Sequence, residues 1–285
     1  MMNQYIDLHV HTTASDGSMT PSEVVRYAAK KDLSAIAITD HDTIAGVEEA
    51  YIVGNKVGVE VISGIEISVH DKQELHILGY FVDLHSNELN ITLDRLKEYR
   101  EKRNPRIIEK LNGLGMDISM SEVKQIAGTG VVGRPHIAQI MVQKGYVGSV
   151  DEAFSKYLDN GKLAYVERQK LLPQDGISLI KKSGGLAVLA HPIYLRKEDD
   201  ELEVLLAQLI DYGLDGIEAY YSEYPADISR KYRALAKRLN LVITGGSDFH
   251  GKSKPDLDLG IGYGSLRIPY ELIYDLKRRV KEEVH

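Results

Sequence analysis

Histidines and acidic residues that stand at the ends of apolar runs constrain this chain more than any other feature. The first case is His9 and His11, which follow Ile6 and Leu8 in a short apolar segment. Because side chains alternate along an extended chain, both imidazoles project from the same face of a strand end. A His-x-His pair is common and is weak evidence for a metal site by itself. It becomes informative because similar residues recur along the chain.

The apolar runs predict strands that are mostly separated by helices. The predicted strands cover residues 6–9, 34–39, 59–67, 74–81, 185–190, 215–219 and 241–244. A first helix is expected after Thr20, which caps it, with Pro21 at its first position and Glu23 as the capping-box partner. Further helices are expected over 43–53, 202–212, 228–239 and 270–284. This alternation indicates an α/β fold, either a barrel or an open doubly wound sheet.

The spread of the ligand-type residues favours the barrel. Residues of this kind follow the first, second, third, fifth and seventh predicted strands: His9, His11, His41, Glu66, His191, Asp248 and His250. Only a closed ring brings the ends of all these strands to one mouth, where barrel enzymes carry out their chemistry. A carboxylate such as Glu66 at the end of a buried strand is costly unless it is paired or bound to a metal. Asp40 and Asp42 flank His41 and suit a supporting role.

Between residues 95 and 165 the strand pattern gives way to helical spacing. We therefore expect a helical insertion subdomain over 95–165 within a barrel domain formed by 1–94 and 166–285. The insertion carries a run of basic residues: Arg95, Lys97, Arg100, Lys102, Arg103 and Arg106. A solvated helix face is the favoured interpretation of this run.

Bulk properties restrict the class of protein. The chain has 285 residues, 43% hydrophobic and 27% charged, which suits one large α/β domain with an insert. It has no cysteine, so disulfides and thiolate metal sites are excluded, and a reducing cytoplasm is expected. No signal peptide or membrane-spanning run is expected. A net charge of −7 argues against a surface that coats nucleic acid, although a positive site could still bind a small anion.

The set of motifs resembles the PHP (polymerase and histidinol phosphatase) family. The matching segments are His9-Val10-His11, Thr39-Asp40-His41-Asp42, Gly64-Ile65-Glu66, His76, Ala190-His191-Pro192 and Ser247-Asp248-Phe249-His250. The resemblance covers nearly the whole chain. It implies a distorted seven-stranded α/β barrel with a cluster of two or three divalent metal ions. His76 is assigned only through this resemblance, since a lone histidine inside a strand is more often a core residue.

The resemblance also implies how the ligands are shared. One metal would be held by His9, His11, Glu66 and Asp248, and Glu66 would bridge to a second metal held with His76 and His191. A third would take Asp16, His41 and His250, and Asp16 stands where some members carry histidine. Catalysis is assigned to the ligands Asp16, His41, His191, Asp248 and His250. Imidazole and carboxylate ligands without sulfur suit Mn, Fe or Zn.

Two segments of the insertion, at residues 133–138 and 161–166, resemble one PHP subgroup. That subgroup includes phosphoesterases that act on nucleoside 3′,5′-bisphosphates and on short RNA from the 5′ end. On this basis Arg134, His136 and Lys162 are candidate substrate-binding residues. A helix-start ion pair for Arg134 and a solvated loop charge for Lys162 are the simpler alternatives.

The function expected from these features is metal-dependent hydrolysis of a phosphate ester, by attack of a hydroxide held between metal ions. The substrate would be a nucleotide such as a 3′,5′-bisphosphate, or a short 5′-phosphorylated single-stranded RNA or DNA. Nothing in the sequence indicates an obligate protein partner. Alternatives are a small-metabolite phosphatase of the histidinol-phosphatase type, an amidase-type hydrolase, and a metal-stabilised module without catalysis.

Overall fold

A computed structural model describes residues 4–71 and 75–283. The chain divides into two compact units. Unit 1 comprises Met1–Ile91 and Lys170–His285, and unit 2 comprises Thr92–Gln169. Each unit is described by itself.

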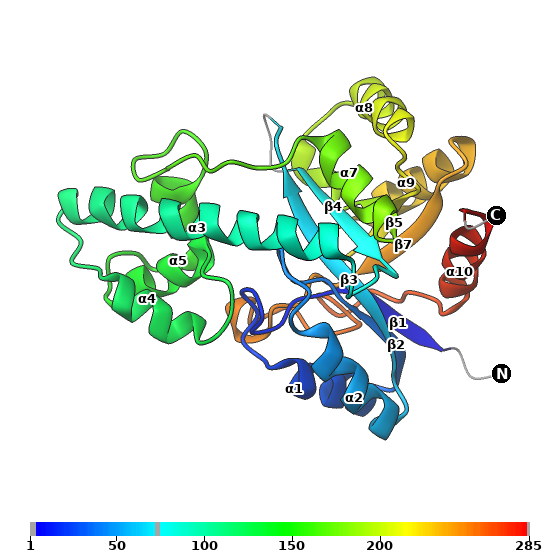
Figure 1. The fold of residues 1–285 in the computed structure, drawn as a ribbon, viewed down its shortest axis with the longest axis horizontal. Coiled ribbons are helices and arrows are strands. Elements are labelled where there is room, and N and C mark those ends of the chain that lie inside the picture. Colours follow the sequence, from blue (N-terminus) through cyan, green and yellow to red (C-terminus); the bar gives the residue numbers. More distant parts are fainter. Residues whose placement is uncertain (1–3, 72–74, 284–285) are drawn as a thin grey trace. The chain divides into compact units, whose positions relative to one another are not determined.

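Unit 1 is built on a sheet of seven strands in sequential order (Figure 1). The strands are β1 (Tyr5–Val10), β2 (Leu33–Ile38), β3 (Glu60–Val69), β4 (Leu75–Tyr80), β5 (Leu186–Leu189), β6 (Gly216–Tyr221) and β7 (Val242–Gly246). All neighbouring strands are parallel except that β4 runs antiparallel to both β3 and β5. The short connection from β3 to β4 explains this exception, because a parallel crossover needs about a dozen residues. Glu74, the predicted start of this strand, lies outside the described residues.

The first and last strands approach each other and nearly close the sheet into a barrel. The N–H of His11 donates to the carbonyl of Phe249 at 2.9 Å, and the N–H of Asp248 donates to the carbonyl of His9 at 2.9 Å. Gly246 permits this approach, because a Cβ built there would lie 2.1 Å from the Cβ of His9. The predicted seven-stranded α/β barrel is thus confirmed, with β4 reversed.

Helices pack against the strands of unit 1. They are α1 (Pro21–Lys30), α2 (Val47–Val57), α7 (Pro173–Lys182), α8 (Asp199–Asp211), α9 (Ala226–Arg238) and α10 (Glu271–Glu283). The capping box of Thr20 and Glu23 at α1 forms as predicted. The helix expected over 43–53 begins later, after Gly46. Sequence analysis did not identify α7, which begins with Pro173 at its first position.

The core of the barrel is formed by small and branched side chains from its strands. Ile6 and Leu8 of β1 and Val188 of β5 pack together with Ile273 and Leu276 of α10. All of these side chains are fully buried. The apolar runs that predicted the strands therefore supply the barrel interior, and the polar residues that follow them are left at the strand ends.

Unit 2 is helical. It contains most of α3 (Asn87–Gly113), then α4 (Met120–Ala127), α5 (Arg134–Gln143), the short α6 (Val150–Ala153) and the π-helix η1 (Phe154–Leu158). Its core includes Ile107, Leu111, Ile137, Met141 and Leu158.

One expectation for this unit is wrong in part. The basic run on α3 is not a uniformly solvated face, since Arg100 and Arg103 are only 8% and 5% exposed. Their i, i+3 spacing places both on the side of α3 that meets the loop before α5, where the side-chain N–H of Asn104 donates to the carbonyl of Val132 at 2.9 Å. The other basic residues of the run, Arg95, Lys97, Lys102 and Arg106, are exposed as predicted.

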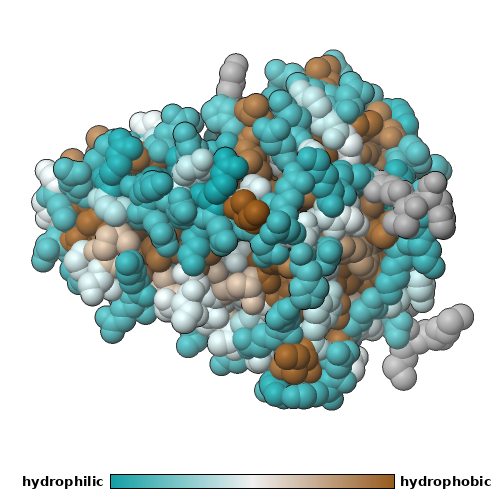
Figure 2. Space-filling model, in the orientation of Figure 1, coloured by the Kyte–Doolittle hydropathy of each residue, from teal (hydrophilic) through white to brown (hydrophobic). Residues whose placement is uncertain are grey.

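Hydrophilic side chains predominate on the face of the molecule shown in Figure 2, with hydrophobic side chains interspersed among them. Among the described residues, none of the helices combines the length and the apolar character needed to span a bilayer.

Candidate metal centre

The candidate site includes the two histidines at the end of β1, His9 and His11. The Nε2 atoms of His9 and His11 lie 3.2 Å apart, so both rings do project to one side. Each also lies near Glu66, which comes from β3: the Oε2 atom of Glu66 is 3.5 Å from His9 Nε2 and 3.3 Å from His11 Nε2. These three residues could hold one metal ion.

Glu66 occupies the middle of the cluster. Its Oε1 atom lies 2.9 Å from His76 Nδ1 and 3.0 Å from His191 Nε2. Its Oε2 atom lies 2.9 Å from His41 Nδ1. The two oxygens of Glu66 face different histidines, so this carboxylate has the geometry of a bridge between neighbouring ions.

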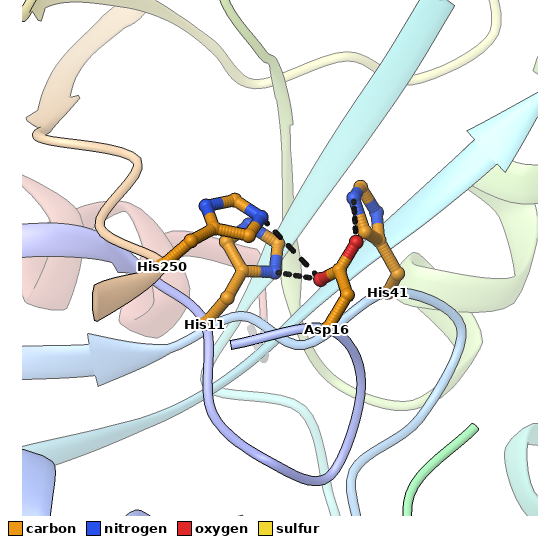
Figure 3. A group of neighbouring side chains, drawn as sticks. All are labelled: His11, Asp16, His41 and His250. Carbon is orange, nitrogen blue, oxygen red and sulfur yellow. Dashed lines mark ion pairs between the residues drawn. The ribbon is translucent and has the colours of Figure 1, made fainter. Parts of the chain in front are cut away.

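A second group of side chains surrounds Asp16 (Figure 3). Its Oδ1 atom lies 3.3 Å from His250 Nε2 and 3.7 Å from His11 Nδ1, and its Oδ2 atom lies 3.8 Å from His41 Nε2. These four residues come from the segment after β1, the end of β2 and the end of β7, and together they could hold an ion.

Asp248 joins the cluster from the end of β7. Its Oδ1 atom lies 3.2 Å from His11 Nε2 and 3.5 Å from His9 Nε2. Its Oδ2 atom accepts hydrogen bonds from the Tyr221 hydroxyl at 2.8 Å and from Lys254 Nζ at 2.7 Å. One oxygen is therefore directed to the cluster, and the other is held by the surrounding structure.

The structure thus brings together all nine residues that sequence analysis named as metal ligands. They are His9, His11, Asp16, His41, Glu66, His76, His191, Asp248 and His250. Imidazole nitrogens and carboxylate oxygens are donor atoms that suit a divalent metal. His41 Nδ1 and Glu66 Oε2 lie 2.9 Å apart, yet both atoms are buried and neither makes a hydrogen bond. A shared cation explains this pairing, because buried polar atoms otherwise require a hydrogen-bond partner.

The charges of the cluster are strongly coupled. Burial disfavours an ionised Glu66, but His41, His76 and His9 hold the pKa of its carboxyl well below the usual range. Burial likewise disfavours a charged His11, but Asp248 and Glu66 raise its pKa to about 10. The neighbouring carboxylates thus favour the protonated forms of His9 and His11 in the protein alone, since the pKa of each is raised. A metal ion would displace these protons, so metal binding is expected to release them.

Buried carboxylates outside the cluster hold its ligands in position. Glu218 of β6 is fully buried, and its Oε1 atom accepts from His9 Nδ1 at 2.9 Å. This contact places the proton on Nδ1 and leaves Nε2 of His9 for a metal. The Oε2 atom of Glu218 accepts from the backbone N–H of His191 at 2.7 Å. Sequence analysis missed Glu218, although a glutamate inside an apolar strand was a signal that could have identified it.

Asp40 and Asp7 support the backbone around the ligands. Asp40 accepts hydrogen bonds from the N–H and the hydroxyl of Thr12 at 2.8 and 2.7 Å, which orders the loop that carries Asp16. Asp7 accepts from the N–H of Ser247 at 2.8 Å, just before Asp248. The expectation that Asp40 supports the site therefore has a direct geometric basis.

Three residues at this site have strained backbone conformations. His191 and Asp248 adopt positive φ angles of 25° and 59°, and Asp42, next to His41, has a φ of 53°. Non-glycine residues avoid this region because of steric clash, and such strain persists where surrounding contacts enforce it. Here it turns candidate ligands toward the cluster at the point where strands end.

The three candidate substrate-binding residues lie in unit 2. Arg134 is the first residue of α5, and its Nη1 atom donates to the carbonyl of Leu158 at 3.0 Å. His136 is buried, and its Nδ1 atom accepts from the N–H of Gly133 at 3.0 Å, so the ring caps the helix. Lys162 is exposed in the loop after η1. Arg134 and His136 thus share the first turn of one helix.

Replacement of the central carboxylate tests the metal centre. Glu66→Gln should lose most of the divalent metal that the purified chain retains after dialysis, because an amide cannot supply two anionic oxygens to neighbouring ions. Elemental analysis of metal per chain measures this. Glu60→Gln, on the same strand but outside the cluster, should retain the full metal content. Full retention in Glu66→Gln would show that Glu66 is not a bridging ligand.

Glu218 provides a separate test of the supporting contacts. In Glu218→Gln, one amide N–H must face either the ring N–H of His9 or the backbone N–H of His191. We expect the affinity for Mn²⁺ to fall by about 10- to 100-fold, as is usual for partners of metal-bound histidines. Titration with Mn²⁺ measures the affinity, and Glu223→Gln serves as a control outside the ring of ligands. Unchanged affinity would remove Glu218 from this role.

Comparisons with known proteins agree with this geometry. A 5′-3′ exoribonuclease from Haemophilus influenzae is 35% identical over 250 residues, which cover 87% of this chain and 91% of the relative. A 3′,5′-nucleoside bisphosphate phosphatase from Chromobacterium violaceum is 31% identical over 257 residues, which cover 90% of each chain.

A solved structure from Bifidobacterium adolescentis, assigned as a metal-dependent phosphoesterase, superposes with a TM-score of 0.86. It is 29% identical, and the match covers 97% of this chain and 96% of the solved one. The sequence model of the PHP domain matches residues 7–212, more than half of the chain. The chain therefore belongs to the PHP family.

Proposed function

We propose that this PHP-family phosphoesterase hydrolyses phosphate esters of nucleotides, with a nucleoside 3′,5′-bisphosphate or a short 5′-phosphorylated oligonucleotide as substrate. The observation that carries the proposal is the convergence of imidazole and carboxylate groups on both oxygens of Glu66. The names of two relatives support the substrate class, since they act on nucleoside bisphosphates and on RNA from the 5′ end.

The residues of the cluster would hold the metal ions that the reaction requires. Two or three divalent ions, of Mn, Fe or Zn, would neutralise charge on the phosphoryl oxygens and lower the pKa of a bound water. His9, His11, Glu66 and Asp248 would hold the first ion, and Glu66, His76 and His191 the second. Asp16, His41 and His250 would hold a third.

Two further features of the site suit an anionic substrate. Lys254 is held at 2.7 Å from Asp248 and adds a positive charge at the edge of the cluster. His250 Nδ1 donates a hydrogen bond to the carbonyl of Asp248 at 2.8 Å. The other ring nitrogen, Nε2, faces Asp16 and is the atom that would bind a metal ion. The centre therefore combines fixed donor atoms with a cation that attracts phosphate.

A second phosphate would be recognised by residues of unit 2. Ions at the centre would act on the scissile phosphate alone, so they would not distinguish one phosphate ester from another. Arg134 suits a second phosphate because its planar guanidinium binds phosphate oxygens in pairs. Its place at the first residue of α5 adds the positive end of a helix dipole. His136 and Lys162 are proposed to contribute to the same recognition.

A small-metabolite phosphatase of the histidinol-phosphatase type is the second candidate, because it would use the same centre. Release of phosphate from a panel of esters separates the two. We expect a nucleoside 3′,5′-bisphosphate to exceed histidinol phosphate in kcat/KM, with activity abolished by a chelator and restored by Mn²⁺. A preference for histidinol phosphate would reject the nucleotide assignment, and activity that resists chelation would reject the metal dependence.

Arg134 can be tested through substrate choice. Arg134→Ala should lose about 2–4 kcal/mol in kcat/KM on a nucleoside bisphosphate, because the second phosphate loses its paired hydrogen bonds. The loss on a simple aryl phosphate, which has no second phosphate, should be much smaller. Arg95→Ala, an exposed arginine on α3, is the control. Equal losses on both substrates would mean that Arg134 acts on the reacting phosphate or on folding.

A further inference from the structure

Lys254 is a cation beside the candidate metal centre that cannot itself bind a metal ion. Its Nζ atom lies 2.7 Å from Oδ2 of Asp248. Among the described residues, it is the one lysine or arginine that forms an ion pair with any of the three carboxylates of the cluster, Asp16, Glu66 and Asp248. An ammonium has three N–H donors and no lone pair for a metal. When ions bind, the histidines become ligands, whereas Lys254 keeps its donors for another acceptor.

The loop after β7 holds the backbone of Lys254 at a fixed position. Gly251 has a φ of 64°, and a Cβ built there would lie 2.3 Å from the hydroxyl oxygen of Ser18. That hydroxyl accepts a hydrogen bond from the N–H of Lys252 at 2.7 Å, and the N–H of Lys254 donates to the carbonyl of Gly251 at 3.0 Å. Three residues further on, Leu257 is buried in the core. The loop is therefore attached both to the segment that follows β1 and to the core.

Asp248 does not depend on Lys254 alone for its position. Its Oδ2 atom also accepts a hydrogen bond from the hydroxyl of Tyr221 at 2.8 Å, and Tyr221 is a buried residue of β6. The backbone N–H of Asp248 donates to the carbonyl of His9 at 2.9 Å. If Lys254 turned to another acceptor, Oδ2 would keep the hydroxyl as its partner, so no buried acceptor would be left unsatisfied. The ammonium can therefore be shared with a ligand.

The ammonium is also accessible. The side chain of Lys254 is 35% exposed, and among the described residues Asp248 is the one side chain that accepts a hydrogen bond from its Nζ atom. Two of the three N–H donors thus remain for a ligand. The other oxygen of Asp248, Oδ1, faces His9 and His11 at 3.5 and 3.2 Å. A single carboxyl group therefore separates the ammonium from the place of the first ion, and a phosphate on that ion would come within reach of Nζ.

Metal binding would change the balance of charge around Lys254. In the protein alone, the carboxylate of Asp248 attracts the ammonium. A divalent ion on Oδ1 would take up the negative charge of this carboxylate and would repel the ammonium. The negative oxygens of a phosphate group, placed between the ion and the ammonium, would offset this repulsion. Fixed donors at such a place also stabilise the charge of a transferring phosphoryl group in the transition state.

We propose that Lys254 is a catalytic residue, whose ammonium donates a hydrogen bond to a non-bridging oxygen of the scissile phosphate. The ammonium keeps its proton while the bond from phosphorus to the leaving oxygen breaks and the bond to the attacking oxygen forms. The inference rests on the proposed function only in that the reacting group is a phosphate ester, whichever ester is preferred. It goes beyond the attraction of an anion to the site, because a bond to the reacting group that is strongest in the transition state raises kcat.

Calorimetric titration of the Mn²⁺-loaded full chain with inorganic phosphate, a product of the reaction, tests the contact without catalysis. Lys254→Met should raise the dissociation constant by about 10- to 100-fold, the loss expected for a hydrogen bond between charged groups. Its Mn²⁺ content, from elemental analysis, should equal that of the unmodified chain. Lys252→Met changes an exposed lysine of the same loop and should bind phosphate normally. Unchanged phosphate affinity in Lys254→Met would overturn the proposal, and so would loss of Mn²⁺, because Lys254 would then act through Asp248.

Kinetics with an aryl phosphate separate a direct contact from attraction at a distance. Lys254→Met should lower kcat by about 100-fold, as is usual when one donor to the transition state is removed. Attraction alone would raise KM and leave kcat unchanged. Lys254→Arg keeps a cation with N–H donors and should bind phosphate more tightly than Lys254→Met. An unchanged kcat in Lys254→Met, or equal phosphate affinity in the two variants, would reject the catalytic role. A preference of the unmodified chain for histidinol phosphate would reject the proposed nucleotide substrate and leave the role of Lys254 standing.

Discussion

The contact on which the candidate centre depends is that of Glu66 with the histidines around it. An ionised carboxylate that is only 1% exposed is costly unless positive groups surround it, and here both of its oxygens face imidazoles. The reversed strand β4 makes this possible. In the antiparallel register of β3 and β4, Ser68 pairs with His76, which places His76 on the diagonal from Glu66 across the two strands. The exception to the parallel barrel is therefore what brings His76 to the site.

The surroundings of the cluster follow from the same physical requirement. Nitrogen ligands must present the correct ring atom, and the loops that carry carboxylates must be held at fixed positions. Buried carboxylates meet both needs: Glu218 orients His9, Asp40 orders the loop of Asp16, and Asp7 holds the chain next to Asp248. Each of these groups is desolvated, so each depends on the hydrogen bonds that it accepts. The positions of the nine candidate ligands therefore depend on buried carboxylates that do not themselves belong to the cluster.

Unit 2 differs from unit 1 in the kind of charge that it buries. In unit 1, histidines surround carboxylates, whereas α3 of unit 2 buries the side chains of Arg100 and Arg103. Sequence analysis treated Arg100 and Arg103 as parts of a solvated helix face, because a basic run on a long helix is usually exposed. Burial of these two side chains depends on the packing of α3 against the loop before α5, where Val132 lies 28 residues beyond its partner Asn104. Periodicity within one helix carries no information about such a partner.

The sequence by itself determined the α/β class, the strand ends that carry His9, Glu66 and Asp248, and the family to which the chain belongs. These follow from local patterns, because apolar runs predict strands and the residues after them fall at one end of a barrel. Tertiary structure alone decided the reversal of β4, the role of Glu218 and the burial of Arg103. Each of these depends on which distant segment becomes a neighbour, and that depends on packing between elements rather than on the pattern within any of them.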